Sequence, residues 1–376
     1  MTPIHRRDRL GLFAIGSGTD RLLRAGLLTL VALLTSVAVN NLLRYHPWGA
    51  DVEIPLRATQ RWVQGDRPYL PESFLAGPGY DLPFLYPPFV LPFLVPLLAL
   101  PRLAVAAGWF AMEVAIAAWT CRRLAIPWRW VALVLLWPPF AEALLGGNIQ
   151  ILLFGAFVGL FFAPSSARAP WHPVDRDPGD DDRPALLDGL LGVVNGALKF
   201  TQAHPWVLLL RRRPRAALLG AAVVVLILLV TLPLTGTQLC FDWLAQLNRA
   251  NDPSWPWVGS SFTQYLPRPL AIGVTVMTIG LAFVVPRRYA GAWLGILMVV
   301  GSPSLRIFGL VFLLPAMLVI RREFALIAAF LVTTYMISGI WLAVVLAAGS
   351  LALGLRYPAL LEPATGSVDA QPGAAP

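Results

Sequence analysis

The stretch AALLGAAVVVLILLVTLPLT, residues 216–235, contains no charged side chain and matches the roughly 20 apolar residues that a helix needs to cross a membrane. Similar apolar runs recur from Leu22 to Leu355. Of the 376 residues, 57% are hydrophobic and 13% are charged, whereas a soluble domain carries about 25% charged residues. Too little charge is present to solvate the surface of a soluble protein. The sequence therefore predicts an all-α, polytopic transmembrane helical bundle.

The predicted bundle has about 10–12 spans. We divide the chain into a cytoplasmic leader (1–21), a single transmembrane domain (22–355) and a disordered tail (356–376). Ala185–Leu210 is interpreted as two short segments that meet near Lys199, and Ala325–Leu355 as a hairpin hinged near Ser338. Phe84–Leu100 is interpreted as a segment that dips into the membrane and returns. The predicted spans are Leu22–Leu43, Phe84–Leu100, Leu103–Cys121, Trp128–Leu145, Ile149–Ala163, Ala185–Leu210, Ala216–Thr235, Leu270–Val285, Ala290–Val300, Leu305–Ile320 and Ala325–Leu355.

Clusters of arginine predict the orientation, because cytoplasmic loops carry an excess of basic residues. The formal net charge is +9, and the arginines gather at the ends of apolar runs, which indicates a topology signal rather than nucleic-acid binding. Clusters at 6–9, 211–215, 287–288 and 321–322 place the N-terminus in the cytoplasm. The loops 44–82 and 236–268 and the break at 301–304 then all open on the outer side.

The first outer loop predicts an amphipathic helix in the membrane interface, with Trp48 and Trp62 at a suitable depth. Its apolar side is formed at helical spacing by Val52, Leu56, Thr59 and Val63.

Asp51 begins this predicted helix, and two interpretations stay open at this point. It is either a helix N-cap or a general base that takes a proton from an acceptor hydroxyl. Glu53 and Asp66 are rivals for the second role, because residue type does not separate the three carboxylates.

Lys199 is the single lysine of the chain, so 29 − 1 = 28 of the basic residues are arginine. A lysine at span depth faces a polar cavity or a partner, or it snorkels from a short helix end. In the first case it is a point charge for a phosphate, and His204 and Gln202 line the same pocket. Arg306, directly after the 301–304 break, is either an interfacial anchor or a bidentate phosphate ligand.

Polar residues also interrupt the apolar runs at Tyr86 and at Gly146–Gln150. The cysteines, Cys121 and Cys240, and the four histidines have no metal-ligand spacing, and no nucleotide-binding loop is present. We therefore expect no cofactor and no metal.

In this order, the motifs resemble the polytopic GT-C class glycosyltransferases, specifically the family 87 polyprenyl-phosphate-mannose-dependent mannosyltransferases. The resemblance implies transfer of a sugar, mannose in that family, from a polyprenyl-phosphate donor to a glycan or glycolipid at the outer face of the bacterial plasma membrane. It implies that Asp51 is the base and that Lys199 lies near the donor phosphate. The motifs are Asp51 with Gly65–Tyr69, Leu85–Pro88, Gly147–Gln150, Asn195–Lys199 with Arg211–Arg213, and Gly301–Ser304.

The sequence departs from the family pattern after its Ser-Pro element, where Leu305–Phe308 stand in place of Trp and His. Arg306 replaces the His as a phosphate ligand, or the protein has an altered donor or no activity. The predicted phosphate ligands are thus Lys199, Arg306 and His204. The predicted substrate-lining residues are Glu53, Asp66, Tyr69, Tyr86, Asn148, Gln150, Gln202, Ser302 and Ser304.

Two other functions remain open. A transporter or flippase of a lipid-linked solute would also use an intramembrane lysine and broken helices, but it predicts paired interruptions in two related halves, and no such repeat is present. A non-catalytic scaffold derived from these enzymes would explain the missing His.

Overall fold

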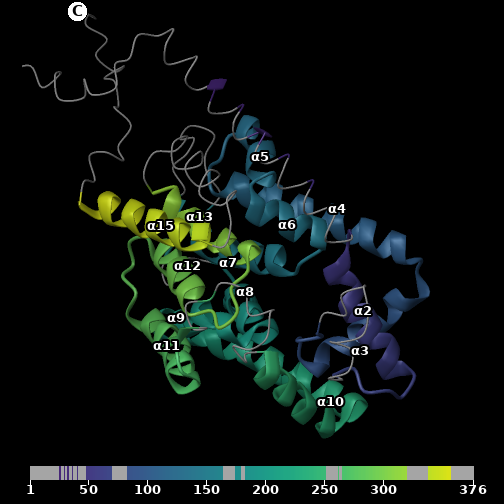
Figure 1. Ribbon diagram of the computed structural model, residues 1–376. Coiled ribbons are helices and arrows are strands. Elements are labelled where there is room, and N and C mark those ends of the chain that lie inside the picture. The colour runs from purple at the N-terminus through teal and green to yellow at the C-terminus, as the bar shows by residue number, and fades with distance from the viewer. Residues whose placement is uncertain are drawn as a thin grey trace, which may run out of the picture.

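The computed structural model describes residues 48–69, 83–163, 174–178, 183–250, 261, 265–319 and 338–356, with scattered positions between 25 and 40. These residues are all-α except for one antiparallel pair of two-residue strands (Figure 1). The elements are α2 (Ala50–Val63), η3 (Pro88–Val90), α3 (Leu91–Leu94), η4 (Val95–Ala99), α4 (Arg102–Arg123), α5 (Trp128–Leu135), α6 (Pro138–Gly146), α7 (Gln150–Phe161), β1 (Phe162–Ala163), β2 (Val174–Asp175), α8 (Ala185–Leu198), η5 (Phe200–Gln202), α9 (His204–Arg212), α10 (Pro214–Ala250), α11 (Arg268–Leu281), η7 (Ala282–Val284), α12 (Ala290–Val300), η8 (Ile307–Leu313), α13 (Leu314–Met317) and α15 (Ser338–Arg356).

One predicted break is confirmed, because the chain leaves the helical path at Lys199 between α8 and α9. Helix α15 covers Ser338–Arg356, whereas residues 325–337 of the predicted hairpin lie outside the described residues, so its hinge stays a prediction. By length and apolar composition, α4 and α10 are the two described helices long enough to cross a membrane. The other apolar helices described are shorter, so the number of spans stays a prediction. The leader 1–21, most of Leu22–Leu43 and the tail beyond 356 lie outside the described residues.

Two predicted spans are broken by proline, which removes a helical hydrogen bond and clashes with the preceding turn. Trp128–Leu145 divides into α5 and α6 at Pro138. Phe84–Leu100 is a series of short pieces, η3, α3 and η4, each with a proline in its first turn. Neither segment is one regular helix.

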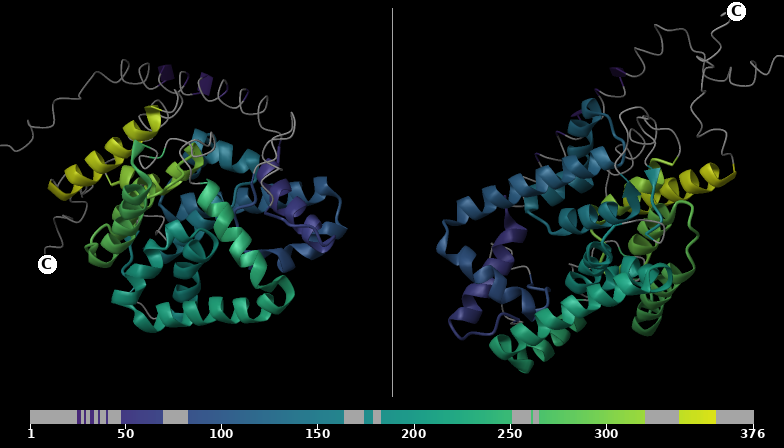
Figure 2. Two further views of the ribbon diagram at one scale, coloured as in Figure 1. Left: turned by 60° about the horizontal axis from the view of Figure 1, so that its bottom comes forward. Right: turned by 180° about the vertical axis from the view of Figure 1, so that it is seen from behind.

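Helix α10 confirms the predicted end of the span Ala216–Thr235 and then continues, after Gly236, as a second helical segment to Ala250 within the predicted connection 236–268. Its axis changes direction at Gly236, which has φ 74° and ψ 158°, and Figure 2 shows the resulting corner. The second half stays helical because it packs on the first loop: Leu239 joins a buried cluster with Tyr69 and Phe84, and Trp243 Nε1 donates to Leu85 O at 2.9 Å.

Helix α7 is the centre of the core and packs against α4, α8, α12 and η8 (Figure 1). It is buried on all sides, as expected for a helix without a polar face. Phe154 and Phe157 each meet Phe312 of η8 edge to face, with ring centroids 5.4 and 5.3 Å apart. Helices α8 and α10 touch through their backbones, because a Cβ on Gly189 would collide with Ala216 O.

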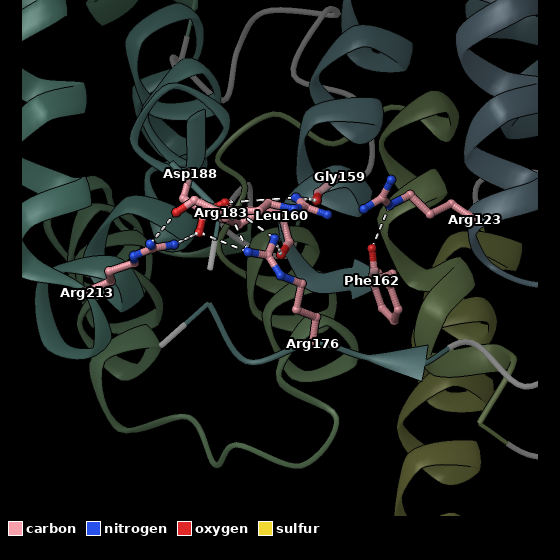
Figure 3. Close-up of polar contacts among 8 residues, drawn as sticks. All are labelled: Arg123, Gly159, Leu160, Phe162, Arg176, Arg183, Asp188 and Arg213. Atoms are coloured by element: carbon pink, nitrogen blue, oxygen red, sulfur yellow. Dashed lines mark hydrogen bonds and ion pairs between the residues drawn. The ribbon is translucent and has the colours of Figure 1, made fainter. Parts of the chain in front are cut away.

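One end of α7 meets a cluster that we call the arginine clamp: Asp188 with Arg123, Arg176, Arg183 and Arg213 (Figure 3). Asp188 lies in the first turn of α8, and its side chain is fully buried. Arg176 Nη2 lies 3.2 Å from its Oδ2, Arg183 Nη1 lies 3.9 Å from its Oδ1, and Arg213 donates to Oδ2. One buried carboxylate therefore compensates several arginines at once.

Three of these arginines bind carbonyls at the C-terminal end of α7. Arg183 donates to Gly159 O at 2.8 Å, Arg176 to Leu160 O at 3.3 Å and Arg123 to Phe162 O at 2.6 Å. The last carbonyls of a helix have no partner within the helix and carry its negative dipole end. The clamp thus caps α7 and ties it to the start of α8.

Candidate active site

Asp51 lies in the first turn of α2, and the local backbone explains how it is placed. Gly49, with φ 74°, occupies the N-cap position, and no side chain caps the helix. The N-cap interpretation of Asp51 is therefore wrong. Gly49 N donates to Leu145 O at 2.9 Å, which fixes the start of α2 against the end of α6.

The carboxylate of Asp51 is held by an amide far away in sequence. Asn148 Nδ2 donates to Asp51 Oδ2 at 2.7 Å. Asn148 is itself oriented, because its Oδ1 accepts a hydrogen bond of 3.0 Å from Gln150 N at the start of α7. Two residues that the sequence predicted separately are thus in direct contact.

Two glycines let α2 approach the turn between α6 and α7, which carries Asn148. Gly147 ends α6 with φ 72°, and a Cβ there would collide with the side chain of Val52. A Cβ on Gly146 would lie 3.1 Å from Asp51 Oδ2. The turn can therefore bring the Asn148 amide to Asp51 only with small residues at both positions.

Further ionisable groups share the surroundings of Asp51. Tyr86, Glu113 and Glu142 each interact with it electrostatically, and Glu142 also interacts with Arg306. The structure thus brings Arg306 and Tyr86, both predicted, to the same region as Asp51.

Glu113 and Glu142 were missed by the sequence analysis. Glu113 is fully buried in α4, where Trp109 Nε1 donates to its Oε1 at 2.9 Å and its Oε2 has no partner among the described residues. The signal was available, because an ionisable residue inside an apolar run marks a functional position by default. Both glutamates were passed over as parts of the spans 103–121 and 128–145.

The other two candidate carboxylates lie on α2 and beyond its end. Glu53 forms a part-exposed ion pair with Arg57 at 3.0 Å and lies 4.0 Å from Arg102. Asp66 is exposed beyond the helix end. Of the three carboxylates, Asp51 is the one in contact with another candidate residue.

The apolar side of α2 packs on α3, η4 and α4, whereas Val63 is 57% exposed, contrary to its predicted place on that side.

Tyr69 supports the segment that carries Tyr86. Its hydroxyl donates to Tyr86 O at 2.7 Å, and its ring lies 5.3 Å from that of Phe84. Burial, with Cys240 and Asp242 nearby, raises the pKa of the Tyr69 phenol, so that the hydroxyl stays protonated and able to donate.

The 301–304 break is fixed by hydroxyl groups. Ser261 Oγ donates to Ser302 O, Thr275 Oγ1 donates to Gly301 O at 2.8 Å, and Ser302 Oγ donates to Ser304 O at 2.7 Å. The break leads into η8, which starts after Arg306. The roles of Ser302 and Ser304 toward a substrate stay predictions.

Lys199, Gln202 and His204 form a second group at the junction of α8 and α9. Lys199 is half-buried, and its side chain has no ion-pair partner in the described part of the chain. Gln202 and His204 are buried. No hydrogen bond or ion pair among the described residues joins this group to Asp51.

The directions of α7 and α8 nevertheless place both the Asp51 group and the Lys199 group away from the arginine clamp. Gln150, next to Asn148, begins α7 about 14 Å from Gly159 at the clamp, and Leu198 ends α8 about 15 Å from Asp188. Both candidate groups therefore lie at the helix ends remote from the arginines. No group of three or more metal-ligating side chains occurs among the described residues.

Comparison with protein families matches residues 84–302 to Glycosyltransferase family 87. This match, on an all-α chain rich in apolar helices, defines the class of the protein as a glycosyltransferase. The chain belongs to glycosyltransferase family 87. Neither a comparison with curated proteins nor one with solved structures found a match. The matched segment includes Asn148 and Lys199 but begins after Asp51 and ends before Arg306.

Proposed function

We propose that this glycosyltransferase moves a sugar from a polyprenyl-phosphate donor to a hydroxyl of a glycan or glycolipid acceptor. The sequence resemblance to mannosyltransferases indicates that the sugar is mannose. The transfer takes place at the outer face of a bacterial plasma membrane and within a single membrane domain. The observation that carries the proposal is the Asp51–Asn148 contact of 2.7 Å in a chain of this family.

In the proposed reaction Asp51 takes the proton of the acceptor hydroxyl. The hydroxyl oxygen then forms a bond to the anomeric carbon of the sugar, while the bond from that carbon to the phosphate oxygen breaks. The electron pair of that bond leaves with the polyprenyl phosphate, and the anomeric configuration inverts. The hydrogen bond from Asn148 aims the carboxylate at its substrate.

Cations assist the leaving group, because negative charge grows on the phosphate as the bond breaks. Arg306 is suited to this role by its guanidinium, which can bind two phosphate oxygens at once. Lys199 is suited to it because no carboxylate of the described residues neutralises it. His204 lies in the same junction, at the start of α9. No metal is needed in this scheme.

The surface of α10 supports a membrane location. Four of its apolar side chains are more than half exposed: Val225 at 53%, Leu226 at 60%, Leu229 at 64% and Val230 at 61%. A stripe of this kind is costly in water and stable in lipid. A cytoplasmic position of the arginine clamp, expected from the positive-inside rule, supports an outer position for the Asp51 group at the opposite end of α7.

The proposal is tested with purified protein in lipid nanodiscs, supplied with polyprenyl-phosphate mannose and a mannan-type acceptor. We expect mannose to appear on the acceptor and free polyprenyl phosphate to accumulate in equal amount. Polyprenyl-phosphate glucose in a parallel reaction reports the choice of sugar. Movement of the intact donor across a liposome bilayer without any transfer would contradict the proposal and indicate a flippase.

Asn148→Ala is expected to lower kcat by about tenfold to a hundredfold, because it removes a hydrogen bond to a charged group, worth about 1.5–3 kcal/mol. Asp51 remains present but is no longer aimed, so some activity should persist. Steady-state transfer rates check this result. Gln64→Ala, an exposed amide beyond the end of α2, is the matched control and should keep the wild-type rate. Equal rates for Asn148→Ala and wild type would remove Asn148 from the site.

A further inference from the structure

The junction of α8 and α9 contains buried polar atoms without hydrogen-bond partners among the described residues. Asn195 Oδ1 and Nδ2, Thr201 Oγ1, Gln202 Oε1 and both ring nitrogens of His204 are in this state. The four residues are at most 4% exposed. Each such atom costs about 1–3 kcal/mol when it is left unpaired. The occurrence of six such unpaired atoms within ten residues requires an explanation beyond packing.

The junction closes on itself. A Cβ on Gly196 would lie 3.0 Å from Ala203 Cβ, so the last turn of α8 touches the start of α9. Lys199 N donates to Asn195 O at 2.9 Å, and Gln202 N donates to Lys199 O at 2.7 Å. The unpaired side chains are therefore held close to Lys199 by their own backbone.

The chemistry of these atoms indicates a ligand that both donates and accepts hydrogen bonds. A phosphate diester offers acceptors alone, so it satisfies Lys199 and the Asn195 amide nitrogen but leaves Gln202 Oε1 and Asn195 Oδ1 unpaired. Sugar hydroxyls both donate and accept, and they can pair with amide oxygens, amide nitrogens and a serine-like hydroxyl alike.

We propose that the α8–α9 junction reads the sugar of the lipid-linked donor: Asn195, Thr201 and Gln202 bind its hydroxyls while Lys199 binds its phosphate. This inference rests on the proposed function and assigns sugar selection to this segment. The atoms are shielded from solvent without ligand, so the junction opens as the donor enters. The unpaired atoms lower the cost of that opening, because the closed form leaves them unsatisfied.

The test measures binding of two probes in nanodiscs, undecaprenyl phosphate and undecaprenyl-phosphate mannose, with undecaprenyl-phosphate glucose as a third. Asn195→Leu and Gln202→Met keep side-chain size but remove the hydrogen-bonding groups. We expect each to bind the mannose lipid about tenfold more weakly and to bind the sugar-free lipid within twofold of wild type. Lys199→Met should weaken binding of both lipids.

Thermal unfolding without ligand separates recognition from a structural role. A buried amide with no partner does not stabilise the fold, so the two apolar variants should unfold at or above the wild-type temperature. Phe200→Ala, 46% exposed in the same junction, is the control and should bind all three probes like wild type. Lower unfolding temperatures together with equal loss of both lipids would overturn the proposal.

The outcome is distinguishable from that of the proposed function. If the variants lose binding of the mannose lipid alone and the protein transfers no sugar, the role of the junction is supported and the proposed transferase function is contradicted. If the protein transfers sugar, and Asn195→Leu and Gln202→Met keep wild-type binding and wild-type sugar preference, the transferase function is supported. The junction would then have no part in recognising the sugar.

Discussion

Asp51→Asn is expected to lower kcat for sugar transfer by about 10²–10⁴-fold, the usual contribution of a general base. The amide has the size of the carboxylate but cannot act as a base toward the hydroxyl proton of the acceptor substrate. Donor binding should change little, since the phosphate and sugar are held by other residues in the proposed site. Transfer rates in nanodiscs measure the first effect, and binding of undecaprenyl-phosphate mannose measures the second.

The comparison that gives this result its meaning is Glu53→Gln, which changes a carboxylate two residues away on the same helix. Glu53 faces Arg57 and Arg102 rather than Asn148, so we expect a much smaller loss. A large loss in Glu53→Gln with near-normal activity in Asp51→Asn would transfer the role of base to Glu53. Full activity in both variants would leave the reaction without a base on α2.

Residue type alone could not choose among Asp51, Glu53 and Asp66, because all three are carboxylates of one predicted outer loop; the family resemblance was what singled out Asp51. The choice depends on a contact with Asn148, which is 97 residues away in the chain. That contact exists because Gly146 and Gly147 allow α2 to approach the turn. Spacing within one segment carries no information about such an approach.

Local breaks were easier to predict than the course of helices. The break near Lys199 was predicted together with a segment Phe84–Leu100 that dips and returns, because the two features reconcile the number of spans with a cytoplasmic position for Arg122, Arg123 and Arg129. Broken helices at membrane depth are tolerated where they line a cavity. The predicted end of the span at Thr235 agrees with the non-helical backbone of Gly236, an ordinary stop signal. The helical segment after Gly236 was not predicted, because packing of Leu239 and Trp243 on the first loop stabilises it and this packing is a tertiary effect.

The arginine clamp was not predicted, although one of its residues, Arg213, lies in a cluster that was interpreted as a topology signal. The run 211–215 was assigned to the cytoplasm by charge alone, and Asp188 was part of an apolar span. The structure gives the arginines a second task, because they cap α7 and surround one carboxylate. The sequence gives the sign of each charge, but the fold determines which residue is its partner.

Asp188→Asn is expected to destabilise the folded protein by about 3–5 kcal/mol, the cost of removing one partner from a buried ion pair. Arg176 and Arg213 would then face each other and Arg183 without the charge that compensates them. Unfolding of the purified protein by heat or by denaturant in detergent measures the effect. Asp188→Glu keeps the charge and should recover part of the loss.

Glu53→Gln is the matched control, because it breaks an ion pair of similar length on the surface. The Glu53–Arg57 distance is 3.0 Å and that of Asp188–Arg176 is 3.2 Å, but the first pair is solvated and should contribute about 0–1 kcal/mol. Equal, small losses in both variants would show that the clamp is not compensated by Asp188. A large loss in Asp188→Asn alone would show that burial decides the difference. Because the clamp holds the ends of α7 and α8 opposite to Asn148 and Lys199, its loss should also loosen both candidate groups together.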